Sequence, residues 1–176
     1  KQQIIASRSF GSLVETADVL KDAVSVFVAN ACAKLRAQSS HASVIQVFLM
    51  TNRFRQDLPQ YSPSLVVPLP QPTNDSLVVS RWADYLVDRM FRPGYQYKKA
   101  GVMLSGISPQ GIYQTDWLEP PQAVDTRLMD ALDGLNKRYG RGTVKVSTQG
   151  AYKQWQMKQE NKSPDYTTDW HAMPVV

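Results

Sequence analysis

The fold is decided by residues 18–51, where DVLKDAVSVFVANACAKLRAQ (18–38) is followed, after SSHAS (39–43), by VIQVFLMT (44–51). Apolar residues recur every three or four positions in the first stretch, which predicts one amphipathic helix ending near Gln38. The second stretch is rich in branched and aromatic residues, which predicts a strand. Its alternation separates Ile45, Val47 and Leu49 on one face from Gln46, Phe48 and Met50 on the other.

A strand is expected before this unit, at Ile4–Phe10, and the same order then recurs. The repeat consists of a strand at 65–69, a turn at 70–74, a helix at about 75–91 capped by Asn74 or Asp75, and a strand at 100–108. Two β-α-β units side by side form a four-stranded sheet with both helices on one face, because crossovers are right-handed. The predicted fold class is α+β, with the other face of the sheet open and Lys99 pointing outward from it.

Three regions are expected along the chain. The duplicated domain occupies 1–110, a linker ended by two prolines occupies 111–124, and a small appendage occupies 125–176. The appendage is expected to hold a helix at about 125–139, with a stripe at Leu128, Met129, Leu132 and Leu135. A short strand is expected at Thr143–Ser147, followed by a polar tail that is partly ordered at best.

Composition narrows the class of protein. The chain has 176 residues, 43% of them apolar, which suits a globular protein, and no run of about 18 apolar residues that would span a bilayer. It begins at Lys1 and enters an apolar strand at once, so we interpret it as a fragment of a longer protein. The start has no signal-peptide features, which fits a reducing cytosol. The single cysteine, Cys32, lies in a helical pattern typical of a buried small residue rather than a nucleophile.

The net charge of +5 is unevenly distributed. Residues 1–110 hold 12 Lys and Arg against 7 Asp and Glu, whereas residues 111–176 hold 8 of each. The basic residues gather at predicted strands and turns, which suits a polyanion held on one surface. Solvated loops would give the same composition.

Five ordered segments resemble the UmuC proteins, the catalytic subunits of DNA polymerase V-type translesion enzymes of the Y family. They are Ser7-Arg-Ser-Phe-Gly11, Tyr97-Lys-Lys-Ala-Gly-Val-Met-Leu104, Gly140-Arg-Gly-Thr143, Trp155-Gln-Met-Lys158 and Ser163-Pro-Asp-Tyr-Thr-Thr168. The resemblance covers essentially the whole chain. It implies that residues 1–110 are the little finger, or polymerase-associated domain, whose sheet lies in the DNA major groove. It further implies a role in error-prone synthesis across damaged primer–template DNA during SOS mutagenesis and DNA repair. The expected location is the cytoplasm, in association with the nucleoid.

Holding DNA without reading its sequence requires Arg and Lys beside short hydroxyl and backbone donors. We expect phosphate contacts from Ser7, Arg8 and Ser9, and weaker ones from Arg53, Lys98 and Lys99. The alternative is that Arg8 is a solvated strand residue and that the two serines are simply polar.

The resemblance also places a peptide that binds the β sliding clamp at Gln114-Thr-Asp-Trp-Leu118. An extended linker can insert two large apolar side chains, here Trp117 and Leu118, into a pocket while Gln114 bonds to its rim. Asp116 lies within the same peptide. Thr115 stands where leucine is common in the family, and Trp117-Leu118 replaces leucine-phenylalanine. The alternative is a hydrophobic linker that docks on its own domain.

In the UmuC family the C-terminal segment associates with the UmuD′ dimer and with the RecA filament. Trp155, Met157 and Tyr166 are the expected anchors for these accessory proteins, although Asp165 stands where a basic residue is common.

No residue of the chain is predicted to be catalytic. His41 and His171 lack metal-ligand spacing, and no glycine loop suits a phosphate. No cofactor is expected in this fragment, and the resemblance places magnesium on carboxylates of an upstream palm domain. The rival hypothesis is a ferredoxin-like protein-interaction or small-molecule regulatory module that dimerises through its open sheet face.

Overall fold

The computed structural model describes residues 2–110, 126–140, 142–150 and 155–157. Its elements follow one another as β1 (Gln3–Val14), α1 (Ala17–Ala37), β2 (Ser40–Thr51), β3 (Ser64–Thr73), α2 (Ser76–Met90), β4 (Tyr97–Pro109) and α3 (Arg127–Tyr139), with a short 3-10 helix, η1 (Ser147–Gln149). The four strands form one sheet in the order β1-β4-β2-β3, and each neighbouring pair is antiparallel. The predicted α+β class is confirmed.

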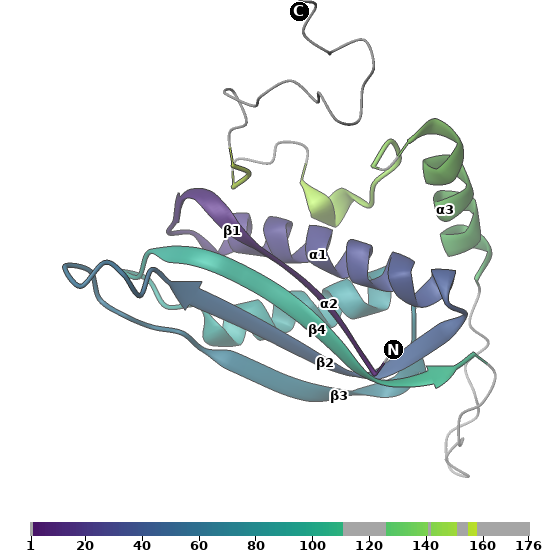
Figure 1. Ribbon diagram of the computed structural model, residues 1–176, viewed down its shortest axis with the longest axis horizontal. Helices are drawn as coiled ribbons and strands as arrows, with labels where there is room; N and C mark the ends of the chain where they lie inside the picture. Colours follow the sequence, from purple (N-terminus) through teal and green to yellow (C-terminus); the bar gives the residue numbers. More distant parts are fainter. Residues whose placement is uncertain (1, 111–125, 141, 151–154, 158–176) are drawn as a thin grey trace, which may run out of the picture.

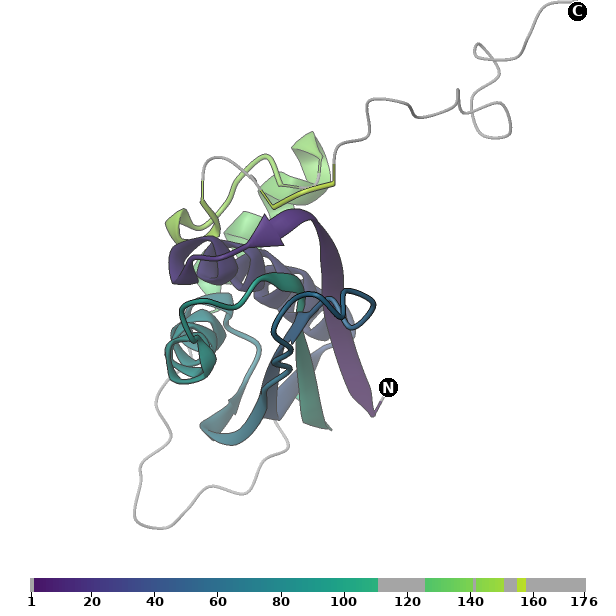
Figure 2. The same cartoon turned by 90° about the vertical axis from the view of Figure 1, so that its left-hand side faces the viewer.

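The two β-α-β units interleave, which the sequence did not predict. Strand β4 lies between β1 and β2, and β2 lies between β3 and β4, so each unit contributes a strand to the middle of the other. Helices α1 and α2 both pack behind the sheet, while its other face is open toward the viewer (Figure 1). The side view separates the helical layer from the strands (Figure 2). One face of the sheet is therefore open, as the sequence predicted, and can serve as a binding surface.

The core lies between the sheet and the two helices because alternate strand residues point toward the helices. In register across the sheet, Ile4 is opposite Leu104, which is opposite Ile45 on its other side. All three side chains are buried. The same layer continues through Ala100, Val102, Val47 and Leu49, and is closed by Leu20, Val24, Leu35, Val79 and Leu86 of the helices.

Strand β3 extends to Thr73, so the turn predicted at Pro70–Asn74 is wrong. Proline is tolerated here because β3 is an edge strand and pairs only with β2 among the described residues. The pairing register of β2 and β3 also shifts between Ala42 and Val44, which interrupts the backbone hydrogen bonding where the prolines lie. The helix that follows begins as expected: the Asp75 carboxylate accepts a hydrogen bond from the Leu77 N–H at 2.7 Å.

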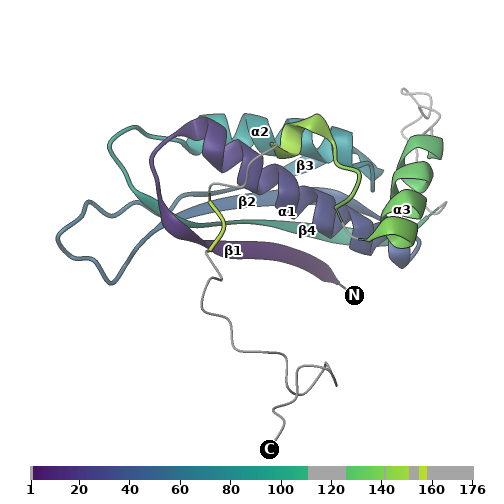
Figure 3. The ribbon, with the colours of Figure 1, turned by 90° about the horizontal axis from the view of Figure 1, so that it is seen from above.

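Helix α3 is attached to the far end of α1 by one charged side chain. Arg36 donates from Nε and Nη2 to the Asp133 carboxylate at 2.6 and 2.8 Å, and from Nη1 to the Asn74 carbonyl and the Ser76 hydroxyl. Seen from above, α3 lies beyond the C-terminal end of α1 (Figure 3). The predicted apolar stripe of α3 is mostly solvent-exposed, since only Met129 is buried. Arg36 thus connects α1, the start of α2 and α3.

The strand predicted at Thr143–Ser147 is wrong. Val144 is held by the side chain of Asn136, whose amide accepts from the Val144 N–H and donates to its carbonyl, each at 3.0 Å. Since this side chain satisfies both backbone groups, Val144 needs no neighbouring strand. The segment instead turns and enters η1, where Thr148 bonds to Ser25 of α1. None of the described helices is long and apolar enough to cross a membrane.

Candidate nucleic-acid interface

The open face is built from alternate residues of four strands. Across β1, β4 and β2, Ser9 is opposite Lys99, which is opposite Met50, and Ser7 is opposite Gly101, which is opposite Phe48. The next row joins Ile5, Met103 and Gln46, and Gln46 donates to the Ser64 hydroxyl of β3 at 2.7 Å. Lys99 therefore points outward, as the alternation of β4 predicted.

Gly101 has a specific role in this surface. A Cβ at this position would lie 2.3 Å from Cζ of Phe48 and 2.5 Å from Cβ of Ser7. The absence of a side chain leaves room for the Phe48 ring of β2 and for Cβ of Ser7 of β1, which both approach Gly101. Side chains from β1 and β2 therefore approach each other over β4 at Gly101.

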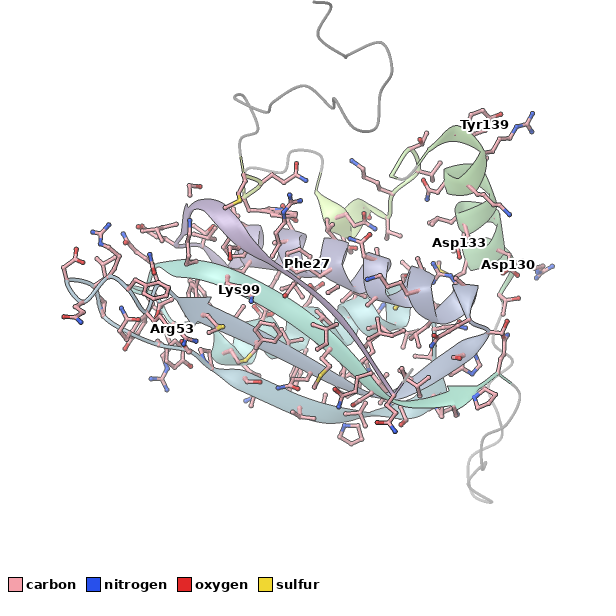
Figure 4. All side chains as sticks on the ribbon, in the orientation of Figure 1. Phe27, Arg53, Lys99, Asp130, Asp133 and Tyr139 are labelled. Carbon is pink, nitrogen blue, oxygen red and sulfur yellow. The ribbon has the colours of Figure 1, made fainter. Side chains whose placement is uncertain are left out.

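Two basic residues lie on this side of the molecule. Figure 4 shows Lys99 over β4 and Arg53 just beyond the end of β2, both on the side turned to the viewer. Arg53 is exposed, Lys99 is half-buried, and neither forms an ion pair with another described residue. Both charges are available to a phosphate backbone.

Ser7, Arg8 and Ser9 do not share one surface, because Arg8 points to the opposite face of β1 from the two serines; phosphate contact by each of them stays a prediction. Arg8 is opposite Ala100, a buried residue of the helix-facing layer, whereas Ser7 and Ser9 are on the open face. The side chain of Arg8 borders α1 instead. Successive side chains of a strand alternate, so three neighbours in sequence could not share one surface.

Lys98 is also less available than expected. Its Nζ donates to the Phe10 carbonyl at 2.6 Å, which joins β4 to the end of β1. The position coincides with a register shift, because Lys99 is opposite Ser9 whereas Tyr97 is opposite Val14. Lys98 therefore supports the sheet at an irregularity.

Other basic residues near the face have local partners. Arg55 forms a two-bond pair with the Asp57 carboxylate at 2.8 and 2.6 Å, and both side chains are exposed. The guanidinium of Arg92 lies over the ring of Tyr61, 4.8 Å from its centroid. Lys99 and Arg53 thus carry the charge of the open face.

The apolar part of the surface was underestimated from the sequence. Ile5 is 53% exposed and Val66 is 58% exposed, and both flank the half-buried Phe48 and Met103. The alternation within 44–51 was the signal, since it placed Phe48 and Met50 opposite the core set. What alternation could not show is that all four strands contribute apolar groups to one patch.

Trp155, expected as an anchor for accessory proteins, is instead a core residue. It is 2% exposed and packs edge-on against Phe27 and Phe10, with ring centroids 5.4 and 6.2 Å away. Its carbonyl accepts a hydrogen bond from the Gly11 N–H at 3.0 Å. Met157 is 48% exposed, as an anchor requires, and Tyr166 lies outside the described residues.

The expected clamp-binding residues Gln114, Asp116, Trp117 and Leu118 also lie outside the described residues. Within the described part of the chain, no group of three or more His, Cys, Asp and Glu side chains is placed to hold a metal ion. Burial raises the pKa of the Cys32 thiol to about 12, so this side chain is an inert core group rather than a nucleophile.

The family follows from comparison with known proteins. The C-terminal domain of the impB/mucB/samB family matches residues 1–117, and a domain of unknown function, DUF4113, matches residues 126–176. Protein UmuC of Salmonella typhimurium is 39% identical over 170 residues, which cover 96% of this chain and 40% of that protein. Protein MucB of Escherichia coli is 38% identical over 178 residues, which cover 100% of this chain and 42% of that protein.

The chain thus spans about two fifths of the length of these relatives. Among solved structures, the insertion ternary complex of Dbh DNA polymerase superposes with a TM-score of 0.51 at 12% identity, over 61% of this chain and 29% of that one. At this identity the likeness shows the fold alone. The family match over residues 1–117 covers the interleaved sheet and the two helices behind it. The chain belongs to the impB/mucB/samB family, of which it contains the C-terminal domain.

Proposed function

We propose that this chain is the DNA-holding C-terminal region of an error-prone translesion DNA polymerase that acts on damaged primer–template DNA. The observation that carries the proposal is the open sheet face, on which Lys99 lies between the serine hydroxyls of β1 and the apolar side chains of β2. A cation beside small hydroxyl groups suits phosphate contact without base reading. Arg53 extends the positive surface beyond the end of β2.

The central test is salt-dependent binding of a labelled primer–template duplex, followed by fluorescence anisotropy. If the face makes about six phosphate contacts, affinity falls by about a thousandfold between about 50 and 200 mM salt. Replacing Lys99 and Arg53 by alanine removes two contacts and lowers the slope of log K against log salt by about 1.8. The matched control is Arg81→Ala, which removes an exposed charge from α2 on the helical side. An unchanged slope in the double variant, or an equal change in the control, would refute the assignment of this face.

The remaining parts of the proposal concern the peptide at 114–118 and the C-terminal segment. The peptide Gln114–Leu118 binds the β sliding clamp through Trp117 and Leu118, and alanine at both positions abolishes pull-down of purified clamp. The C-terminal segment associates with a UmuD′-type dimer and a RecA filament during SOS mutagenesis. Met157 and Tyr166 remain the candidate anchors, since Trp155 is buried. The parent protein acts in the cytoplasm and uses magnesium on palm carboxylates upstream.

A second candidate function is favoured by the apolar content of the same face. Ile5, Phe48, Met103 and Val66 form a patch that could bury a second copy of the chain, as in a dimeric regulatory module. Sedimentation distinguishes the two functions. A stable dimer that is insensitive to salt supports dimerisation, and a monomer with salt-sensitive DNA affinity supports DNA holding.

A further inference from the structure

A groove runs along the outer edge of β1, where this strand borders α1. Its volume is about 650 Å³, and it lies between β1, α1 and the segments that follow α3. A smaller hollow of about 340 Å³ continues it toward the start of β1, because the two share Ile5, Lys34 and Ala37. Figure 3 shows β1 as the outermost strand beside α1.

The edge of β1 can accept another extended chain. Among the described residues β1 pairs only with β4, so its outer N–H and C=O groups from Gln3 to Ser9 meet no strand. Such an edge is a template for strand addition. At its far end this edge already binds backbone, since the Gly11 N–H donates to the Trp155 carbonyl at 3.0 Å. Gln156 passes so close that a Cβ on Gly11 would lie 2.6 Å from its carbonyl oxygen.

The floor of the groove leaves room for side chains. Along α1 it is formed by Ala29, Ala33 and Ala37, which lie four residues apart and therefore on one face of the helix. From Val26 to Gln38 the helix rises roughly 18 Å, the length of about five residues of extended chain. A short linear segment matches these dimensions.

The charge of the groove indicates the chemistry of its ligand. Arg8 and Lys34 both line it, both are exposed, and neither forms an ion pair with another described residue. Arg36 and Asp133 also line it, but they neutralise each other in a salt bridge. Two positive charges therefore remain, one on β1 and one on α1.

We propose that this groove binds an acidic, extended segment of a partner protein, which adds to the sheet beside β1. Backbone hydrogen bonds to the edge of β1 provide the strand pairing, and Arg8 of β1 and Lys34 of α1 contact carboxylates of the segment. Arg8, which points away from the open face, thereby has a role separate from that face. The groove and the open face serve different ligands.

The test uses the whole chain and a labelled peptide of alternating glutamate and valine, followed by fluorescence anisotropy. We expect this peptide to bind, and we expect Arg8→Glu with Lys34→Glu to weaken it by roughly tenfold or more, because two attractions become repulsions. Lys99→Glu, a charge reversal on the open face, is the matched control and leaves the affinity unchanged. Arg8→Ala with Lys34→Ala serves as the milder pair, with circular dichroism to verify folding.

Two further peptides separate the explanations. The same peptide with N-methyl groups at alternate residues cannot pair along one edge, so its binding is lost if strand addition is correct. A peptide with lysine in place of glutamate tests the charge. Equal binding of the acidic and lysine peptides, unchanged binding in the Arg8 and Lys34 variants, or retained binding of the methylated peptide would each overturn the proposal. Displacement of the peptide by single-stranded DNA, with DNA affinity lost in the same variants, would assign the groove to nucleic acid instead.

Discussion

Replacing Trp155 by alanine should destabilise the whole domain, although this residue follows α3 and lies far from the sheet in sequence. Its side chain is 2% exposed and packs edge-on against Phe27 of α1 and Phe10 of β1. Truncating a buried aromatic residue costs about 3–5 kcal/mol, because apolar contacts are lost and a cavity remains. For a chain of this size we expect the melting temperature to fall by roughly 8–15 °C.

The assays are urea denaturation for the free energy of unfolding and thermal denaturation for the melting temperature, both followed by far-UV circular dichroism, which does not depend on the tryptophan removed. Trp155→Phe is the informative companion: it keeps an aromatic ring and removes an indole N–H that finds no acceptor among the described residues, so its cost should be about 1 kcal/mol. Met157→Ala, at an exposed position of the same segment, should change stability by less than about 0.5 kcal/mol. If Trp155→Ala cost no more than Met157→Ala, Trp155 would not belong to the core.

Three further predictions follow from single contacts. Arg36→Met should lower the free energy of unfolding by about 2–3 kcal/mol, because the Asp133 carboxylate loses both of its hydrogen bonds from Arg36. Hydrogen exchange should then become faster at the backbone amides of α3. Unchanged exchange would show that α3 is held by other contacts. Burial lowers the pKa of His41, so the unfolded state binds the proton more readily, and the free energy of unfolding should fall below about pH 6.5 by up to about 1.4 kcal/mol per pH unit. His41→Gln should flatten that part of the pH profile, and an unaltered profile would assign the acid sensitivity to another group. Gly101→Ala should lower the free energy of unfolding by about 1–3 kcal/mol and weaken DNA binding, because the new Cβ would lie 2.3 Å from Cζ of Phe48. Differential scanning calorimetry measures the change in stability and fluorescence anisotropy measures the change in DNA affinity. Wild-type values in both assays would show that the Phe48 ring moves aside at no cost.

The origin of the helices and strands is local, which is why they could be predicted. The stripe of α1 and the alternation of β2 are periodicities within one segment, and each follows from the geometry of a single element. The Asp75 cap likewise depends on residues two apart. One face of the sheet was therefore expected to be open, and Lys99 was expected to point from it.

Elements whose state depends on distant partners were predicted less well. The prolines of β3 are compatible with a strand only because β3 lies at the edge of the sheet, and strand order is a property of the whole fold. Val144 looked like part of a strand, but the Asn136 side chain satisfies its backbone. Sequence periodicity contains no information about the position of β3 in the sheet or about the contact between Asn136 and Val144.

By itself the sequence determined the α+β class, the duplicated order of elements and the family resemblance, because these depend on local patterns and on segments read in order. The tertiary structure decided which side chains share a surface. Strand pairing placed Arg8 on the far side from Ser7 and Ser9, and packing against α1 placed Trp155 in the core. Such assignments require contacts between residues far apart in the chain, which form only when the hydrophobic core assembles and its register is set.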